Sequence, residues 1–406
     1  DYHQMRAEKY DVISKLLYTD KVFILSGYII QKNVKKLEAI LNKNFDLALE
    51  IEDPSDIEDA PVALKNGGFV SPVEDVLEGY SLPGKKDLDP TAIMAIFYYV
   101  LFGMMLSDAA YWLIICLACG FVLLKVKNLE DKIKRAMKMF LFCGVSTIFW
   151  GVMFGSYFGD ATEIISKTFF NTNITIPPVW FTPVNDPMRL LSFCLAIGIL
   201  HIFIGLFLGV IKLILNKKYL DIFLDIIPWY LLVGGAVAYV LSIKTMTSML
   251  SLAFTLPAVA GQISLICMIV GSVVILFMFG RDSKNLVKRL LKGIYGLYGA
   301  TGYLSDILSY SRLLALGLAT GVIAQVFNKI GAMFGGGILG GIVFTFAFLV
   351  GHSMNLGINL LGAYVNTNRL QFVEFLGKFY EGGGRKFLPF SANTKYYRVT
   401  EDINNG

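Results

Sequence analysis

Charged residues are scarce in this chain of 406 residues, and their scarcity excludes a water-soluble domain as its main part. Only 17% of the residues are Asp, Glu, Lys or Arg, whereas soluble globular domains average about 25%. Hydrophobic residues make up 55%, and the mean hydropathy is +0.61. Nearly uncharged runs of about 18 or more residues, typical of spanning helices, recur between residues 91 and 380. The composition predicts an all-α polytopic membrane protein.

Signatures of catalysis and of cofactor binding are missing as well. No G-x-x-x-x-G-K-[ST] loop occurs, so we expect no nucleotide chemistry and no bound cofactor on this chain. The five cysteines lie in predicted spans, where small apolar packing residues are the expected role. Cys116 and Cys119 form a C-x-x-C pair, a weak metal or redox candidate because no histidine lies nearby. The net charge of +5 does not indicate nucleic-acid binding, since the basic residues cluster at span ends.

Residues 1–89 differ in kind from the rest of the chain. Alternating and helical patterns there predict two helices and two strands, at residues 2–17, 32–47, 21–30 and 47–52. We expect a small cytoplasmic α/β piece. The chain begins at Asp1 without an initiator Met, so this piece is expected to be the carboxy-terminal part of a longer domain.

Residues 90–406 are predicted to form a membrane domain of eight helices with a cytoplasmic tail. The spans lie at about 91–104, 106–125, 137–157, 188–214, 222–243, 257–280, 298–328 and 338–380. Lys and Arg gather after every second span and in the tail, which predicts that both termini face the cytoplasm. The last span, about 43 residues, would measure roughly 65 Å. It must tilt steeply or protrude, because the hydrocarbon core is about 30 Å thick.

Two arginines inside the last two spans are the most informative residues of the chain. An arginine at mid-membrane costs about 2.5–3.5 kcal/mol on insertion scales. Its guanidinium cannot escape that cost by losing a proton, because its pKa lies above about 12. Arg312 and Arg369 therefore predict a function that needs fixed positive charge in the membrane.

A polar stripe accompanies the arginine of the last span. Within an arc of about 100° on a helical wheel lie His352, Asn355, Asn359, Asn366 and Arg369. We interpret the stripe as the wall of a hydrated half-channel that ends at Arg369. A polar seam that bonds neighbouring helices is the alternative. His352 is then either part of the ion path or a satisfied core group.

The preceding span carries a shorter stripe, Ser305, Ser309 and Arg312. Asp306 lies about 120° from Arg312 on the wheel, so we expect no ion pair between them. It is a candidate for a cytoplasmic vestibule. Glu374 is either an ionisable relay at a cytoplasmic water entrance or a solvated carboxylate at the interface.

Other polar residues of the spans are not assigned to the ion path. His201 has no partner that the sequence reveals, and Asp108, near the ends of two spans, is expected to be solvated. No acidic residue of the last two spans is expected at the level of Arg312. The counter-charge of this arginine is therefore expected to come from a partner.

Three segments carry a resemblance to a known family. They are LSYSRLLALGLATGVIA at 308–324, NTNRLQFVEFLGKFYEGGGRKFLPF at 366–390 and DLDPTAIMAIFYYVLFGMMLSDAAYWL at 87–113. Together they resemble subunit a of rotary V-type and A-type ATPases, called subunit I in bacteria. The resemblance extends over about residues 20–395. Asn359 and Asn366 stand where some eukaryotic relatives have Glu and His.

The resemblance implies a stator in a prokaryotic cell membrane, with its last two helices long, tilted and set against a rotor ring. Arg312 and Arg369 would face the carboxylates of the ring, and Glu374 lies in the family-like stretch that follows. The implied partners are the c-ring, peripheral-stalk subunits, the base of the central stalk and membrane lipid. H⁺ or Na⁺ would cross through two half-channels while other subunits hydrolyse ATP. The alternative is a self-contained secondary cation transporter or channel.

Overall fold

The structure is a computed structural model that describes residues 2–14, 16–53, 60–84, 87–126, 129–281 and 285–389. These residues form two compact units, which we treat separately. The smaller unit comprises the described residues of Asp1–Lys65, Ser81–Lys85 and Gly382–Gly406, and the larger one those of Asn66–Tyr80 and Lys86–Glu381. Residues 66–80 thus belong to the larger unit. The predicted domain limits at 1–89 and 90–406 stay a prediction.

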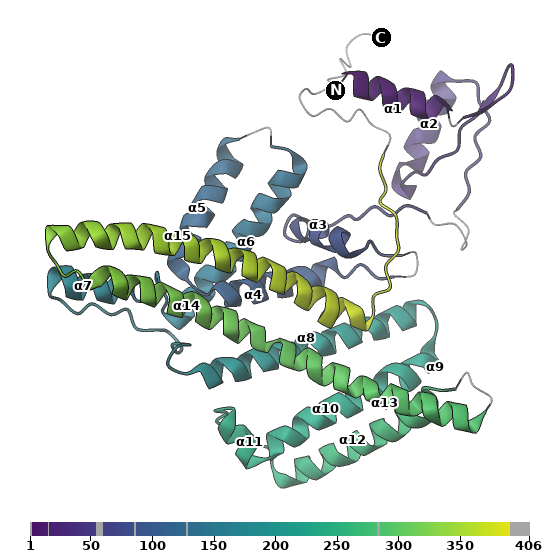
Figure 1. Cartoon of the computed structure of the whole chain (residues 1–406). Coiled ribbons are helices and arrows are strands. Elements are labelled where there is room, and N and C mark those ends of the chain that lie inside the picture. Colours follow the sequence, from purple (N-terminus) through teal and green to yellow (C-terminus); the bar gives the residue numbers. More distant parts are fainter. Residues whose placement is uncertain are drawn as a thin grey trace. The chain divides into compact units, whose positions relative to one another are not determined.

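The smaller unit contains two helices and one antiparallel pair of strands among its described residues (Figure 1). In chain order these are α1 (Tyr2–Ser14), β1 (Leu17–Tyr18), β2 (Phe23–Ile24), the 3₁₀ turn η1 (Gln31–Asn33) and α2 (Val34–Asn44). In the sheet, Leu17 pairs with Ile24 and Tyr18 with Phe23. The two predicted helices are present at shorter lengths, and the strand predicted at 21–30 is reduced to two residues.

The strand predicted at residues 47–52 is wrong, because these residues are described and none belongs to a strand. A strand is held by hydrogen bonds to a neighbouring strand. The apolar pattern of a short segment does not reveal whether such a neighbour is available.

The larger unit is helical. Its elements are α3 (Ser71–Tyr80), α4 (Thr91–Leu106), α5 (Ala109–Lys125), α6 (Asp131–Phe154), α7 (Ala161–Phe170), α8 (Pro187–Leu215), α9 (Tyr219–Asp221), the π-helical η2 (Ile222–Ile226), α10 (Ile227–Ser242), α11 (Lys244–Met249), α12 (Ala258–Met278), α13 (Leu286–Ser309), α14 (Ser311–Ala332), α15 (Ile338–Arg369), the π-helical η3 (Leu370–Phe375) and the 3₁₀ turn η4 (Leu376–Lys378).

Six helical segments of the described residues are long and apolar enough to cross a membrane. They are Asp131–Phe154, Pro187–Leu215, Tyr219–Ser242, Ala258–Met278, Val287–Ala332 and Ile338–Lys378. The first two predicted spans correspond to α4 and α5, apolar helices of 16 and 17 residues. At about 1.5 Å per residue they measure only about 24 and 26 Å, less than the hydrocarbon core of about 30 Å. The predicted count of eight spans is therefore not confirmed.

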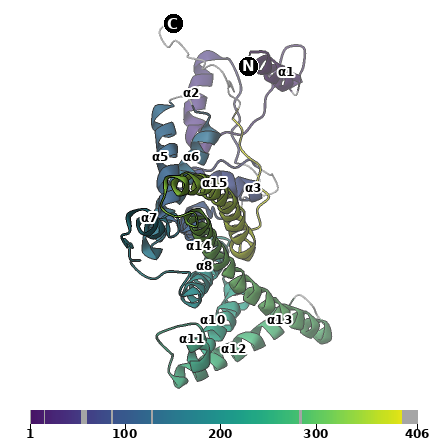
Figure 2. The same ribbon diagram turned by 60° about the vertical axis from the view of Figure 1, so that its left-hand side comes forward.

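The last two candidate spans are the longest, as predicted. Val287–Ala332 has 46 residues and is interrupted at Tyr310, where α13 ends and α14 begins, while Ile338–Lys378 has 41 residues. In both views α14 and α15 run side by side (Figures 1 and 2). The two predicted polar stripes therefore lie on neighbouring helices.

Glycines bring α10, α12 and α13 into close contact. A Cβ atom on Gly293 of α13 would lie 1.9 Å from the carbonyl oxygen of Leu276 in α12, and one on Gly235 of α10 would lie 2.8 Å from that of Ser264. Small residues allow helix backbones to approach closely in membranes. These contacts pack α13, which leads to Arg312, against the α10–α12 pair.

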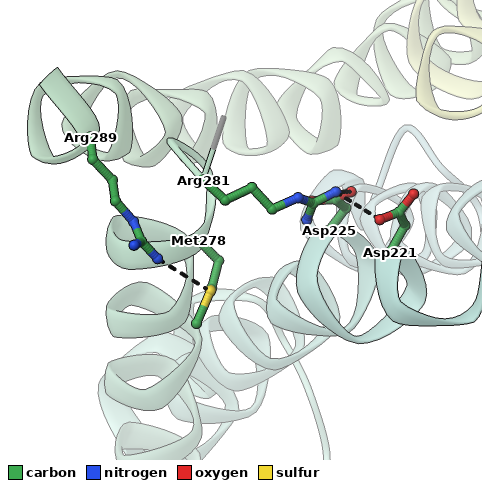
Figure 3. Close-up of polar contacts among 5 residues, drawn as sticks. All are labelled: Asp221, Asp225, Met278, Arg281 and Arg289. Atoms are coloured by element: carbon green, nitrogen blue, oxygen red, sulfur yellow. Dashed lines mark hydrogen bonds and ion pairs between the residues drawn. The ribbon is translucent and has the colours of Figure 1, made fainter. Parts of the chain in front are cut away.

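Ion pairs and hydrogen bonds fasten one end of this helical group (Figure 3). Arg281, just after α12, donates to Asp221 at 2.7 Å and to the two carboxylate oxygens of Asp225 at 2.9 and 3.0 Å. Arg289 in α13 donates from Nε to the carbonyl oxygen of Phe277 at 2.6 Å, and its Nη2 contacts Met278 Sδ at 3.7 Å. The two arginines thus tie the end of α12 to α9 and η2, which lead into α10, and to α13.

Lys212, near the end of α8, joins the first and last segments of the larger unit. Its Nζ lies 2.6 Å from Asp87 Oδ1 and 2.9 Å from Glu381 Oε1, and it donates to the carbonyl oxygen of Phe379 at 3.1 Å. Asp87 precedes α4, and Phe379 and Glu381 follow η4. One ammonium group therefore holds three acceptors from opposite ends of the unit.

Asp108 connects α4 and α5 and is 1% exposed, so the expectation that it is solvated is wrong. It caps α5 by accepting from the backbone N–H groups of Ala110 and Tyr111 at 3.1 and 3.3 Å. It also accepts from Ser156 Oγ at 2.8 Å and from the N–H groups of Phe158 and Gly159 at 3.1 and 2.9 Å. A carboxylate can accept several bonds at once, so one side chain fixes the helix start and the loop after α6.

We expect Asp108→Ala to lower the midpoint temperature of thermal unfolding by several degrees, because hydrogen bonds to a charged group contribute about 1.5–3 kcal/mol each. Asp186→Ala is the matched control. Asp186 also precedes a helix, α8, but it is exposed and its side chain makes no capping bond. Equal midpoints for the two variants in detergent would contradict the structural role of Asp108.

Candidate functional site

Arg312 lies at the start of α14, directly after the interruption at Tyr310. Its side chain is 25% exposed, and its Nη2 is 3.9 Å from Glu374 Oε1. Nη2 also donates to Ser309 Oγ at 3.3 Å, while Nη1 is buried and has no hydrogen-bond partner among the described residues. The guanidinium is thus held through Nη2, and its Nη1 hydrogens have no acceptor among the described residues.

Tyr310 lies at the interruption between α13 and α14, two residues before Arg312, and its hydroxyl contacts His201. Tyr310 Oη and His201 Nδ1 are 2.7 Å apart, and both residues are buried. The imidazole is stacked between the rings of Phe97 and Phe375, with centroids at 4.1 and 4.4 Å. His201 therefore has a partner, and the sequence missed it because that partner is 109 residues away.

A glycine on α8 makes room for this arrangement. A Cβ atom on Gly198 would lie 2.5 Å from Cδ2 of Tyr310. Gly198 precedes His201 by three residues, so both lie on the same face of α8. The pair is the signal in the sequence that could have pointed to a close helix contact there.

Glu374 supplies the acid that was not expected near Arg312. It lies in the π-helical turn η3, and its side chain is only 2% exposed. The expectation that no acid of the last two spans lies at the level of Arg312 is therefore wrong. The reading of Glu374 as a solvated carboxylate is also wrong, whereas its role as a relay stays a prediction. Helix periodicity places residues around one helix but gives no depth relative to a neighbour, which is why the contact was missed.

Asp306 also pairs within the chain, and its partner is Lys378 in η4. The Lys378 ammonium lies 4.0 Å from the centroid of the Tyr303 ring. Ser309 Oγ donates to the carbonyl oxygen of Ser305 at 3.0 Å, and the side chain of Ser305 is exposed. Arg312–Glu374 and Asp306–Lys378 together join α13 and α14 to the segment after α15.

Arg369 stands apart from this group. It is exposed at the end of α15, and no hydrogen bond or ion pair of its side chain is found in the described part of the chain. Its neighbours on the same helical face, Val365 and Val373, are 54% and 56% exposed. Asn366 donates to the carbonyl oxygen of Gly362 at 2.8 Å. The structure thus brings Arg312 and Glu374 together, but not Arg369 with either.

The rest of the α15 stripe is buried, and through His352 and Asn355 it is bonded to neighbouring helices. Asn359 Nδ2 donates to Asn355 Oδ1 at 2.5 Å, and Asn355 Nδ2 donates to Tyr111 Oη at 3.0 Å and to the carbonyl oxygen of Thr320 at 3.1 Å. Tyr111 is hydrogen-bonded in turn to His352 Nδ1. Residues from α5, α14 and α15 therefore share one network.

This network continues to a cleft beside α7. His352 Nε2 lies 2.9 Å from Asn328 Oδ1, and Asn328 Nδ2 donates to Asp160 Oδ1 at 3.0 Å. Asp160 lines a cleft of about 540 Å³ together with Glu163, Lys167 and Lys329.

The network has one direction. The Asn328 amide N–H groups are committed to Asp160 and to the Phe158 carbonyl oxygen. Its Oδ1 must therefore accept from His352, which leaves His352 Nδ1 to accept from Tyr111. Along the path from Asn359 to Asp160, each residue then donates a hydrogen bond to the next one.

These bonds are what the alternative of a polar seam predicts, and the half-channel role of the α15 stripe stays a prediction. Tyr111, Asn328 and Asp160 were missed by the sequence analysis. Asn328 could have been flagged as a buried amide in the last turns of an apolar helix. Tyr111 and Asp160 give no such signal, because their bonds cross between helices and a loop.

Metal binding has no visible basis in the described residues, where no three His, Cys, Asp or Glu side chains gather into a possible site. Cys116 and Cys119 are free thiols. What the arrangement around Arg312 can do is electrostatic. A permanent cation with unused donors stabilises the ionised form of any carboxylate that approaches it.

Comparison with known proteins places the chain in context. Residues 300–392 match the model of the V-type ATPase 116kDa subunit family. The chain is 30% identical to the A-type ATP synthase subunit I of Methanocaldococcus jannaschii, covering 95% of this chain and 57% of that protein. It is 33% identical to the corresponding protein of Pyrococcus horikoshii, covering 95% and 56%. It is also 26% identical to the V-type ATP synthase subunit I of Chlamydia pneumoniae, covering 92% and 61%. The chain thus spans little more than half the length of these curated relatives.

Two tyrosines test the network by the same chemical change. Tyr111→Phe leaves the buried Nδ1 of His352 without its partner and removes one of the two acceptors of Asn355 Nδ2, so we expect a loss of about 1–3 kcal/mol in stability. Tyr98→Phe is the control. Tyr98 is fully buried and its hydroxyl has no partner in the described structure, so its removal should be neutral or stabilising. The measurement is thermal unfolding in detergent, and a larger loss for Tyr98→Phe would overturn the assignment.

Proposed function

We propose that this chain is the stator subunit of a rotary ATPase, because residues 300–392 match the model of the V-type ATPase 116kDa subunit family and nearly the whole chain is similar to subunit I of archaeal and bacterial ATP synthases. In this proposal it is a non-catalytic membrane subunit that forms two ion half-channels against a c-ring. Peripheral-stalk subunits and the base of the central stalk would complete the assembly. ATP would be hydrolysed on other subunits while H⁺ or Na⁺ crosses here.

The exposed Arg369 is the observation that carries this proposal. A permanent charge on an apolar helical face is costly in a membrane unless an acid meets it. The described structure offers Arg369 no such acid. A carboxylate on a partner that packs against α15 would supply it, and a rotor ring carries such carboxylates.

Arg312 supports the proposal through its unused donors. Its distance of 3.9 Å to Glu374 exceeds that of a charge-assisted hydrogen bond, about 2.7–2.9 Å. A guanidinium has five N–H donors, and one of the Arg312 nitrogens has no partner among the described residues. Arg312 is therefore not engaged in a strong bond with Glu374, and the exposed quarter of its side chain can meet a second carboxylate.

The mechanism follows from the charge. An arginine about 4 Å from a ring carboxylate favours its ionised form by roughly 4 kcal/mol at an effective dielectric of about 20. At about 1.36 kcal/mol per pKa unit, this lowers the carboxylate's pKa by about three units. The site must then release its ion beside Arg312 and Arg369. The same fixed charge repels cations that would otherwise leak across.

The half-channels are assigned to the two polar groups of the larger unit. Glu374, Asp306, Ser305 and Ser309 would serve the cytoplasmic side, near the end of α15. His352, Asn355, Asn359 and Asn366 would serve the other side. This assignment is supported by the network that reaches the cleft at Asp160.

A self-contained transporter would also need a carboxylate near Arg312, and Glu374 provides one. The exposed Arg369 has no counterpart of this kind among the described residues, and the relatives are subunits of ATP synthases. Both points favour the stator.

Arg312→Lys is expected to abolish ATP-driven ion transport while the complex still assembles. A lysine can lose its proton when desolvated and presents a single point charge. Pumping is measured in vesicles reconstituted with the purified complex, and Arg189→Lys, at an exposed arginine of α8, is the control. Near-normal pumping by Arg312→Lys would refute the role of Arg312.

Glu374→Gln is expected to slow transport without abolishing it, because the amide keeps the shape of the side chain but cannot carry a proton. The same vesicle assay measures the initial rate, with assembly checked by copurification of the ring. An unchanged rate would remove Glu374 from the ion path.

A further inference from the structure

One buried face of α8 receives two aromatic rings from other helical segments. The face contains Gly198, His201 and Gly205, spaced three and four residues apart and all buried. A Cβ atom on Gly198 would lie 2.5 Å from Cδ2 of Tyr310, and one on Gly205 would lie 3.3 Å from Cδ2 of Phe375. The two glycines therefore make room for the two rings on either side of a single imidazole.

This imidazole contacts both rings. His201 Nδ1 is 2.7 Å from Tyr310 Oη, and the ring of Phe375 is stacked on the imidazole with centroids at 4.4 Å and planes inclined by 19°. Phe97 of α4 covers the opposite face at 4.1 Å and 19°. The two phenyl rings prevent the imidazole from moving along its normal, and the hydrogen bond fixes its rotation in its own plane.

The second nitrogen of His201 indicates that stability alone does not account for this residue. Nε2 is buried and has no hydrogen-bond partner in the described structure. A buried polar atom without a partner lowers stability. An apolar side chain at position 201 would avoid that loss, but it could not bind the hydroxyl of Tyr310.

Both rings are adjacent in sequence to the charged pair of the candidate site. Tyr310 precedes Arg312 by two residues, and Phe375 directly follows Glu374 in η3. The guanidinium and the carboxylate lie 3.9 Å apart, whereas a charge-assisted hydrogen bond would bring them to about 2.7–2.9 Å. Because the pair is not closed by a strong bond of its own, its separation depends on the segments that carry it. His201 contacts both segments.

We propose that His201 is the positioning residue of the Arg312–Glu374 pair. By binding Tyr310 and stacking on Phe375, it holds the guanidinium and the carboxylate near each other but short of a direct hydrogen bond. The consequence for transport rests on the proposed function, in which Arg312 must stay available to a carboxylate of the partner. Closure of the pair would engage Arg312 within its own chain, and a shift of Tyr310 would move Arg312 away from that partner.

Tyr310→Phe tests this role by removing one oxygen atom. The measurement is the pumping rate per assembled complex in reconstituted vesicles, with assembly checked by copurification of the ring. We expect a loss of about tenfold or more, since a misplacement of about 1 Å can cost on the order of 10²-fold in rate. Tyr98→Phe, at a buried hydroxyl without a partner in the described structure, is the control and should pump normally. A purely structural role would reduce the amount of complex but not its rate, so a normal rate for Tyr310→Phe would overturn the proposal.

A double-mutant cycle tests whether the two residues act as one. We expect His201→Leu to slow pumping as Tyr310→Phe does, and the double variant to be no slower than His201→Leu, because both changes remove the same hydrogen bond. His201→Asn, which keeps a polar atom near the place of Nδ1, should restore part of the rate. Losses that multiply in the double variant, or no rescue by His201→Asn, would contradict the positioning role.

Gly198→Ala serves if His201→Leu fails to assemble. The added Cβ atom must displace the ring of Tyr310 while both hydrogen-bonding groups remain in the chain. We expect a loss of pumping per complex similar to that of Tyr310→Phe, and an unchanged rate would contradict the proposal.

The positioning role and the proposed function can fail separately. Normal pumping by Arg312→Lys would refute the stator mechanism. Loss of pumping by Arg312→Lys together with a normal rate for Tyr310→Phe would refute the positioning role alone.

Discussion

A guanidinium that cannot be neutralised by losing its proton is the constraint around which the larger unit is organised. Arg312 lies where α13 ends and α14 begins, and that interruption is fixed by Tyr310, whose hydroxyl meets the buried His201. Glu374 approaches from η3, and Asp306 pairs with Lys378 next to it. The contact with Glu374 partly balances a charge that the membrane does not tolerate alone.

The two arginines are treated differently, and the difference is informative. Arg312 is half-buried, near an acid of its own chain, with donors to spare. Arg369 is exposed between apolar side chains without such an acid in the described residues. Arg312 thus contacts an acid of its own chain, whereas the side chain of Arg369 is exposed at the surface.

Much of this architecture could be predicted from the sequence. Apolar runs located the long helices, and the wheel of the last span placed His352, Asn355 and Asn359 on one face, where the structure finds them in one network. Helix periodicity is a local property, so it reached no further than one helix at a time. The partners Tyr111 and Asn328 lie on other helices and became visible only in three dimensions.

The failures have the same physical origin. Glu374 was expected away from Arg312 because the sequence carries no information on how two helices are offset, or on the π-helical turn that carries Glu374. Asp108 was expected in solvent because it separates two apolar runs, yet five donors from a helix start and the loop after α6 converge on it. The count of eight spans stays open because α4 and α5 are shorter than the hydrocarbon core.

Lys212 has a mechanical consequence. Its ammonium binds Asp87, before the first long helix, and the Phe379 carbonyl and Glu381, after the last. The segment that leads into α4 and the segment that follows η4 are therefore both bound to the same ammonium group. A force that pulls on either connection therefore acts on the same ammonium group, and displacing the entering connection would break the shielded contact with Asp87.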